Sequence, residues 1–144
     1  MNTKEVNAMT DEDLKIKAAE LLGWTECGPS GPYVNVPTGI PPEEWLASKD
    51  EMAVCRLAVY GNILVIPDYL NDISAAWGLF EKIPLPALIS RGYEDAWKVG
   101  PLGYGVELGE CIDDEPEFFL WSISAPAAIT KAFIIAMSDN ELDK

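Results

Sequence analysis

The chain has 144 residues, enough for one domain with a sizeable hydrophobic core that needs no disulfide or metal staple. Hydrophobic residues make up 49% of it and aromatic residues 10%, which excludes an intrinsically disordered protein. The formal net charge is −14, from 24 acidic and 10 basic residues, and the basic residues are scattered among the acids, so we expect no direct binding to nucleic acid.

The first residues, MNTKEVNAMTDEDL, lack the apolar core of a signal peptide, and no apolar run reaches the about 18 residues that a membrane-spanning helix needs. We therefore expect a cytoplasmic protein that does not associate with membranes. The three cysteines, Cys27, Cys55 and Cys111, are widely spaced and form no CxxC pair. We expect reduced thiols, with Cys55 and Cys111 in the core.

The first predicted helix runs from residue 11 to about residue 22. Thr10 followed by Asp13 is typical of a capped helix start, and Leu14 and Ala18 begin its buried stripe. Gly23 supplies the left-handed residue that ends the helix. We expect the preceding residues 1–9 to form a flexible tail.

The next part of the chain contains one ambiguous segment. Residues 26–42 are rich in Gly, Pro, Ser and Asn, which favours loops around a short strand at 33–36, and the following PPEEW indicates a helical turn. Over residues 52–66 two structures compete, because Ser48 and Glu51 suit a helix start whereas Gly61-Asn62 suits a hairpin. We favour the hairpin, since a helix here would be apolar nearly all round.

Residues 66–83, IPDYLNDISAAWGLFEKI, form the stretch around which we expect the fold to be organised. An apolar run stops at Pro67, and Asp68, Asn71 and Asp72 offer side-chain oxygens to the free N–H groups of a helix start. The helix that follows has an apolar stripe that we expect to be buried, formed by Ile73, Ala76, Trp77, Phe80 and Ile83.

Several strands are predicted after this helix. Residues 96–99 indicate a strand, which a turn at Gly100, Pro101 and Gly103 ends. Residues 106–112 alternate as a half-exposed strand does. The strongest strand signal is EFFLWSI, whose apolar residues would lie on both faces, so we expect a central position for it in the sheet.

The last predicted helix covers residues 127–137, with Ser124 as its cap and Pro126 in its first turn. It is apolar around almost its whole circumference and should therefore be buried against the sheet. We expect residues 138–144 to be a flexible tail. This order of elements lacks regular βαβ alternation and predicts a single α+β domain over residues 1–144, with an antiparallel-rich sheet whose apolar surface helices cover.

The sequence contains no histidine, which excludes Ser-His-Asp and Cys-His mechanisms and removes the commonest zinc ligand. It contains no GxxxxGK[ST] phosphate loop, and no GxGxxG follows a strand. We therefore assign no catalytic residue and expect no cofactor, although a mechanism based on paired carboxylates stays open. The acidic run that holds Asp113, Asp114 and Glu115 lacks the EF-hand order, so we favour a solvated turn there over a metal site.

Two groups of residues are candidates for binding a ligand or partner. The strand-to-helix junction is one, because a helix N-terminus can receive an anion or a peptide carbonyl, although capping of its own helix is the role we favour. The other is a pair of tryptophans flanked by charged residues, which we expect near the surface. The candidate residues are Asp68, Tyr69, Asn71 and Asp72 at the junction, with Trp45 and Trp97 as the tryptophans.

Three segments in order, LKIKAAELLGW (14–24), IPDYLNDISAAWGLFEKI (66–83) and SISAPAAITKAFIIAM (122–137), with a hairpin before the last, resemble the phage ABA sandwich domain family. These are small proteins encoded by phages and prophages, chiefly of Gram-positive bacteria. The resemblance implies a sheet with helices packed on both faces, an α-β-α sandwich, and it brings no catalytic residue. Residues 41–60 depart from the family pattern as an insertion.

These observations together predict a phage or prophage accessory protein that acts in the host cytoplasm by binding rather than catalysis. An acidic inhibitor of a host protein is its most specific form. A protein that sequesters a small nucleotide-like ligand is the first alternative, and a carboxylate-dependent enzyme is the second. The sequence leaves the oligomeric state open.

Overall fold

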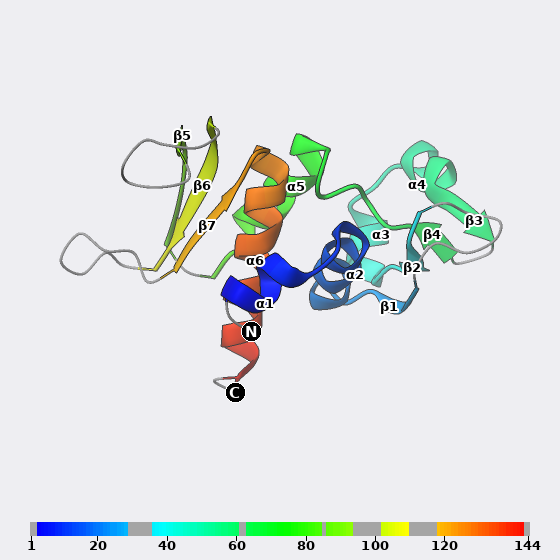
Figure 1. The fold of residues 1–144 in the computed structure, drawn as a ribbon. Coiled ribbons are helices and arrows are strands. Elements are labelled where there is room, and N and C mark those ends of the chain that lie inside the picture. The colour runs from blue at the N-terminus through cyan, green and yellow to red at the C-terminus, as the bar shows by residue number, and fades with distance from the viewer. Residues whose placement is uncertain are drawn as a thin grey trace. The chain divides into compact units, whose positions relative to one another are not determined.

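The computed structural model (Figure 1) describes residues 3–28, 36–60, 63–84, 86–93, 102–109 and 118–142. Its elements fall into two compact units. We call Thr10–Pro67 the small unit, and Met1–Met9 with Asp68–Lys144 the large unit. Each unit contains an antiparallel sheet, so the predicted α+β class is confirmed, with the strands divided between two sheets.

The small unit begins with α2 (Asp11–Leu21), which starts and ends as its sequence predicts. Thr10 caps it, because the Thr10 hydroxyl accepts a hydrogen bond of 3.2 Å from the backbone N–H of Asp13. Gly23 adopts a φ of 101°, which is costly for any residue with a Cβ, and the helix ends there.

The sheet of the small unit has four strands in the order β1-β2-β4-β3, and neighbouring strands are antiparallel. The strands are β1 (Thr25–Gly28), β2 (Thr38–Ile40), β3 (Ala58–Tyr60) and β4 (Ile63–Val65). Two helices lie between β2 and β3 in the chain, namely α3 (Glu43–Ala47), where a helical turn was predicted, and α4 (Glu51–Leu57).

The ambiguous segment at 52–66 contains both of the competing structures. Its second half is the antiparallel pair β3 and β4, as the hairpin prediction requires. Its first half is the helix α4, so the prediction of a strand before Ala58 was wrong. Glu51 places a carboxylate in the first turn of α4, where the helix dipole favours negative charge. The strand predicted at 33–36 lies almost wholly outside the described residues.

The large unit contains a three-stranded sheet in the order β5-β6-β7, formed by β5 (Ala87–Tyr93), β6 (Leu102–Leu108) and β7 (Phe118–Ser122). The prediction that β7 is central was wrong, because β6 occupies the centre. Gly103, which was expected in a turn, lies within β6. The strand predicted at 96–99 lies outside the described residues.

One face of this sheet is covered by α6 (Ala125–Leu142). Val106 pairs with Ile89 on one side and with Leu120 on the other, so all three lie on the same face. Val106 and Leu120 are fully buried, and α6 packs against both β6 and β7. As predicted, α6 is buried, and its fully buried side chains include Ile129, Phe133, Ile134 and Ile135.

Two further helices pack on α6, namely α1 (Thr3–Ala8) and α5 (Ile73–Glu81). Residues 1–9 were expected to be a flexible tail, but they contain α1, because the fully buried Val6 anchors that segment. The tail predicted from residue 138 was also placed too early, since α6 continues to Leu142 and Ser138 is buried.

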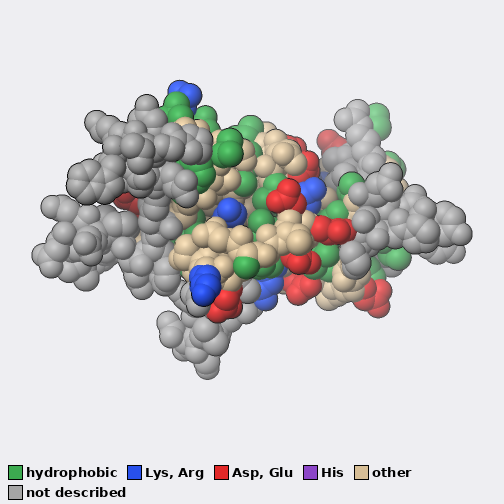
Figure 2. Space-filling view, in the orientation of Figure 1, with side chains coloured by type: hydrophobic (Ala, Val, Ile, Leu, Met, Phe, Trp, Pro, Cys, Tyr) green, Lys and Arg blue, Asp and Glu red, His purple; other side chains and the backbone are tan. Residues whose placement is uncertain are grey.

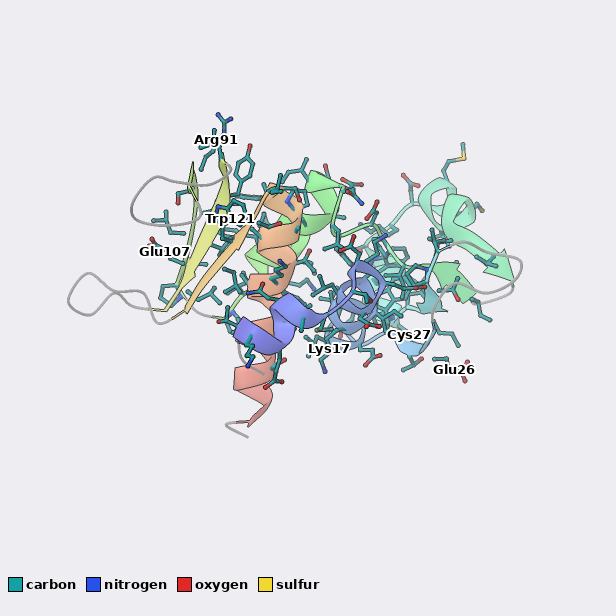
Figure 3. The ribbon with its side chains drawn as sticks, in the orientation of Figure 1. Lys17, Glu26, Cys27, Arg91, Glu107 and Trp121 are labelled. Atoms are coloured by element: carbon teal, nitrogen blue, oxygen red, sulfur yellow. The ribbon has the colours of Figure 1, made fainter. Side chains whose placement is uncertain are left out.

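The opposite face of the same sheet contains a close contact between Gly103 and Trp121, the latter labelled in Figure 3. A Cβ added at Gly103 would lie 2.5 Å from the backbone oxygen of Ser122 and 2.6 Å from Cζ2 of Trp121. The indole of Trp121 therefore lies on the space that the missing side chain leaves. Glycine is required here because the indole and the neighbouring strand both approach its backbone.

We predict that Gly103→Ala lowers the free energy of unfolding by about 1–3 kcal/mol, because the new methyl group must displace backbone or the partly buried indole of Trp121. Urea denaturation followed by tryptophan fluorescence measures the change. Gly92→Ala in neighbouring β5 is the matched control, since nothing lies within 4 Å of a Cβ there, and it should leave stability within about 0.5 kcal/mol. Equal effects of the two substitutions would contradict the assigned contact.

Candidate functional site

The strand-to-helix junction of residues 68–72 is well ordered by its own side chains. The carboxylate of Asp72 accepts hydrogen bonds from the backbone N–H groups of Ser74 at 2.9 Å and Ala75 at 3.4 Å, and so caps α5. The side-chain amide of Asn71 donates to both carboxylate oxygens of Asp68, each at 3.1 Å. These predicted binding residues therefore lie together, and Asp72 has the capping role that the sequence analysis favoured.

Tyr69 and Thr130 join this junction to α6. The hydroxyl of Thr130 lies 2.9 Å from the backbone oxygen of Tyr69 and 2.9 Å from that of Pro126, one turn earlier in α6. Both Tyr69 and Thr130 are buried, so the hydrogen bond is shielded from water. The start of α5 is therefore held in a fixed position on α6.

Two large apolar side chains of α5, Ile73 and Trp77, are exposed, and the half-buried Phe80 lies beside Trp77; we call these three residues the α5 apolar face. Ile73 is 52% exposed and Trp77 is 46% exposed. Phe80 stacks on Trp77, with ring centroids 4.9 Å apart and planes 16° from parallel. The prediction that Ala76 is buried is confirmed, but the prediction that Ile73 and Trp77 are buried was wrong, because Leu79 is the large apolar residue that α5 turns inward. A contiguous exposed apolar surface of this kind is typical of an interaction site.

Acidic side chains lie at both ends of the α5 apolar face. Asp72 precedes Ile73 and is exposed, and Glu81 follows Trp77 by four residues, which places it one helical turn further along the same side of α5. The large unit as a whole contains 15 acidic and six basic residues, a formal charge of −9. Figure 2 shows several Asp and Glu side chains on the described part of the surface, with single Lys and Arg side chains among them.

Trp45 lies in the small unit and is partly buried. Its ring contacts that of Trp24 edge to face, with centroids 5.3 Å apart, and the ammonium of Lys49 lies 5.5 Å from its centroid. Trp24 is 3% exposed, and its indole N–H has no acceptor within the described part of the chain. Trp45 therefore closes a local aromatic cluster, while Trp97 lies outside the described residues.

The described thiols are Cys27 and Cys55. Burial raises the pKa of the Cys27 thiol, and the nearby carboxylate of Glu20 raises it further, so Cys27 is a poor nucleophile at neutral pH. Cys55 is exposed, so the prediction that it lies in the core was wrong. Its position in α4, at the surface of a short helix, accounts for this exposure.

No cluster of three or more Cys, Asp or Glu side chains with the spacing of a metal site occurs within the described segments. Asp113, Asp114 and Glu115 lie outside them. None of the described helices combines the length and the apolar character that crossing a membrane requires.

Comparison of the chain with protein-family models, with curated proteins and with solved structures finds no match. The α5 apolar face is the functional candidate that sequence reasoning missed. Its residues were recognised as a stripe, and Leu79, which lies on another side of the same helix, was the available signal that a different side could pack inward.

We predict that Asp72→Ala destabilises the protein by about 1 kcal/mol, because two backbone N–H groups at the start of α5 lose their acceptor. Asp72→Asn should retain most of the stability, since the amide oxygen caps nearly as well. Thermal unfolding of the three proteins at equal concentration tests this. If Asn destabilised the protein as much as Ala does, the charge of Asp72 rather than its capping bond would be responsible.

Proposed function

We propose that this chain is a phage or prophage accessory protein that acts in the host cytoplasm by binding a host protein and inhibiting it. The α5 apolar face is the single observation that carries the proposal. The resemblance of three segments to phage proteins and the histidine-free sequence support it.

The side chains of the α5 apolar face are suited to binding another protein. Trp77 is a large rigid side chain already ordered by stacking on Phe80, so little side-chain entropy is lost when a partner covers it. Tryptophan is among the residues that dominate binding free energy when buried in an interface, where truncation typically costs about 2 kcal/mol or more. Ile73 extends the same surface by one helical turn.

The acidic charge adds selectivity to this apolar contact. A formal charge of −14 accelerates encounter with a basic partner and repels acidic ones. Many host proteins with basic surfaces bind nucleic acid, and an acidic protein that occupies such a surface competes with that ligand. Inhibition of the host protein follows from occupation alone and requires no catalytic residue.

We predict that Trp77→Ala lowers capture of the host partner at least about tenfold, because the central apolar contact is lost. The measurement is affinity capture from host lysate with the immobilised full chain, quantified by mass spectrometry. Leu88→Ala is the matched control, since Leu88 is 61% exposed in β5 and is not part of the α5 apolar face.

Capture should also weaken in about 0.5 M salt, where charges separated by more than a few ångström are screened. A host protein held equally by wild type and Trp77→Ala would refute the proposed surface. A host protein held equally at low and high salt would refute the contribution of the acidic charge.

A further inference from the structure

We infer that the partner presents a basic amphipathic helix to the α5 apolar face. The inference rests on the proposed function and specifies the chemistry of the partner. It follows from the shape of the exposed side of α5, from the glycine within it and from the charges around it.

The exposed side of α5 has a row of large residues beside two small ones, the arrangement onto which a second helix packs. Ile73, Trp77 and Glu81 follow each other at intervals of four residues and form a ridge along the helix. Ser74 and Gly78 begin the adjacent row, and the side chains at these two positions are small. Two helices pack by placing a ridge of side chains of one helix into a groove between the ridges of the other. A row with small residues beside a ridge of large ones leaves room for the ridge of a second helix.

Gly78 is not explained by the contacts of the large unit itself. It lies in the interior of α5 and is exposed, and a Cβ added there would meet nothing within 4 Å. Glycine at such a position costs about 1 kcal/mol of helix stability relative to alanine. Glycine at position 78 is therefore not required by any described contact within the chain. The absence of a side chain there would let the backbone of a partner helix approach α5 closely.

The charges select a basic partner. Asp72 and Glu81 lie at opposite ends of the α5 apolar face, and the large unit has a formal charge of −9. Lys82 is in the same row as Ser74 and Gly78, on the side away from Ile73. A second copy of this chain and an anionic membrane would both be repelled by this charge. A helix with leucine-like residues along one side and Lys or Arg beside them satisfies both the apolar face and the acids.

A defined peptide tests the inference. The probe is a labelled peptide of about 18 residues, roughly five helical turns, made of Leu and Lys in an order that gives one apolar side. Its control has the same composition in an order with no apolar side. Fluorescence anisotropy with the full-length protein should show binding of the first peptide at least about tenfold tighter than of the second, because only the first can lay a helical ridge on α5.

Two variants localise the binding. Trp77→Ala should weaken binding of the patterned peptide about tenfold or more, and Gly78→Leu should weaken it similarly while leaving α5 folded, because leucine is a good helix former that fills the groove. Leu88→Ala should bind as the wild type does. Circular dichroism of each variant verifies that the fold is retained.

Three outcomes would overturn the inference. One is equal binding of the two peptides, which would show unspecific charge attraction. Another is unchanged binding by the Gly78→Leu protein. The third is a Trp77-dependent association of the protein with itself or with anionic phospholipid vesicles in the absence of peptide. If the peptide fails to bind while capture from lysate still depends on Trp77, the helical partner is refuted and the proposed function stands. If the peptide binds while capture from lysate does not depend on Trp77, the proposed function alone is refuted.

Discussion

The large unit depends on the burial of one helix. Ile129, Phe133, Ile134 and Ile135 lie on different sides of α6 and are all fully buried, so α6 is stable only when other elements surround it. Each such side chain contributes about 1.5–3 kcal/mol when it leaves water. The sheet of β5, β6 and β7 covers one side, and α1 and α5 supply further cover. The positions of these elements therefore follow from the burial of the apolar surface of α6, which each of them covers in part.

A single buried hydroxyl connects the segment before α5 to α6. Within the described residues Thr130 is one of two buried polar side chains, and its hydroxyl reaches the backbone oxygen of Tyr69, 61 residues earlier in the chain. A buried carbonyl without a donor would cost about 1–3 kcal/mol, so this bond favours one placement of the junction. Asp72 then starts α5 three residues after Tyr69. The orientation of α5, with Ala76 inward and Trp77 outward, follows from the Asp72 cap, from the long-range hydrogen bond of Thr130 and from the space available against α6.

Sequence reasoning succeeded where the decisive chemistry is local. Thr10 and Gly23 delimit α2, and Ser124 lies at the start of α6, because caps and left-handed glycines act over three or four residues. Sequence reasoning failed on α5 because large apolar residues occur on more than one side of this helix. Which side is buried depends on how closely its side chains can pack against α6. Ala76 is small enough for close helix contact, which the indole of Trp77 is not. It also missed β5, since two prolines precede that strand and Arg91 and Gly92 within it weaken the strand signal.

The same packing that turned Trp77 outward also makes the α5 apolar face suitable for binding. The start of α5 is fixed by the Asp72 cap and the Thr130 hydrogen bond, and the helix packs on α6. Ile73 and Trp77 are therefore held on one side of a fixed helix without any partner. A partner then loses little of its binding free energy to ordering this surface. A flexible loop with the same residues would lose about 1–2 kcal/mol for each residue that it had to order. The rigid core and the exposed α5 apolar face thus both result from how α5 packs on α6. For the same reason the candidate site consists of helix residues that the sequence predicts to be buried.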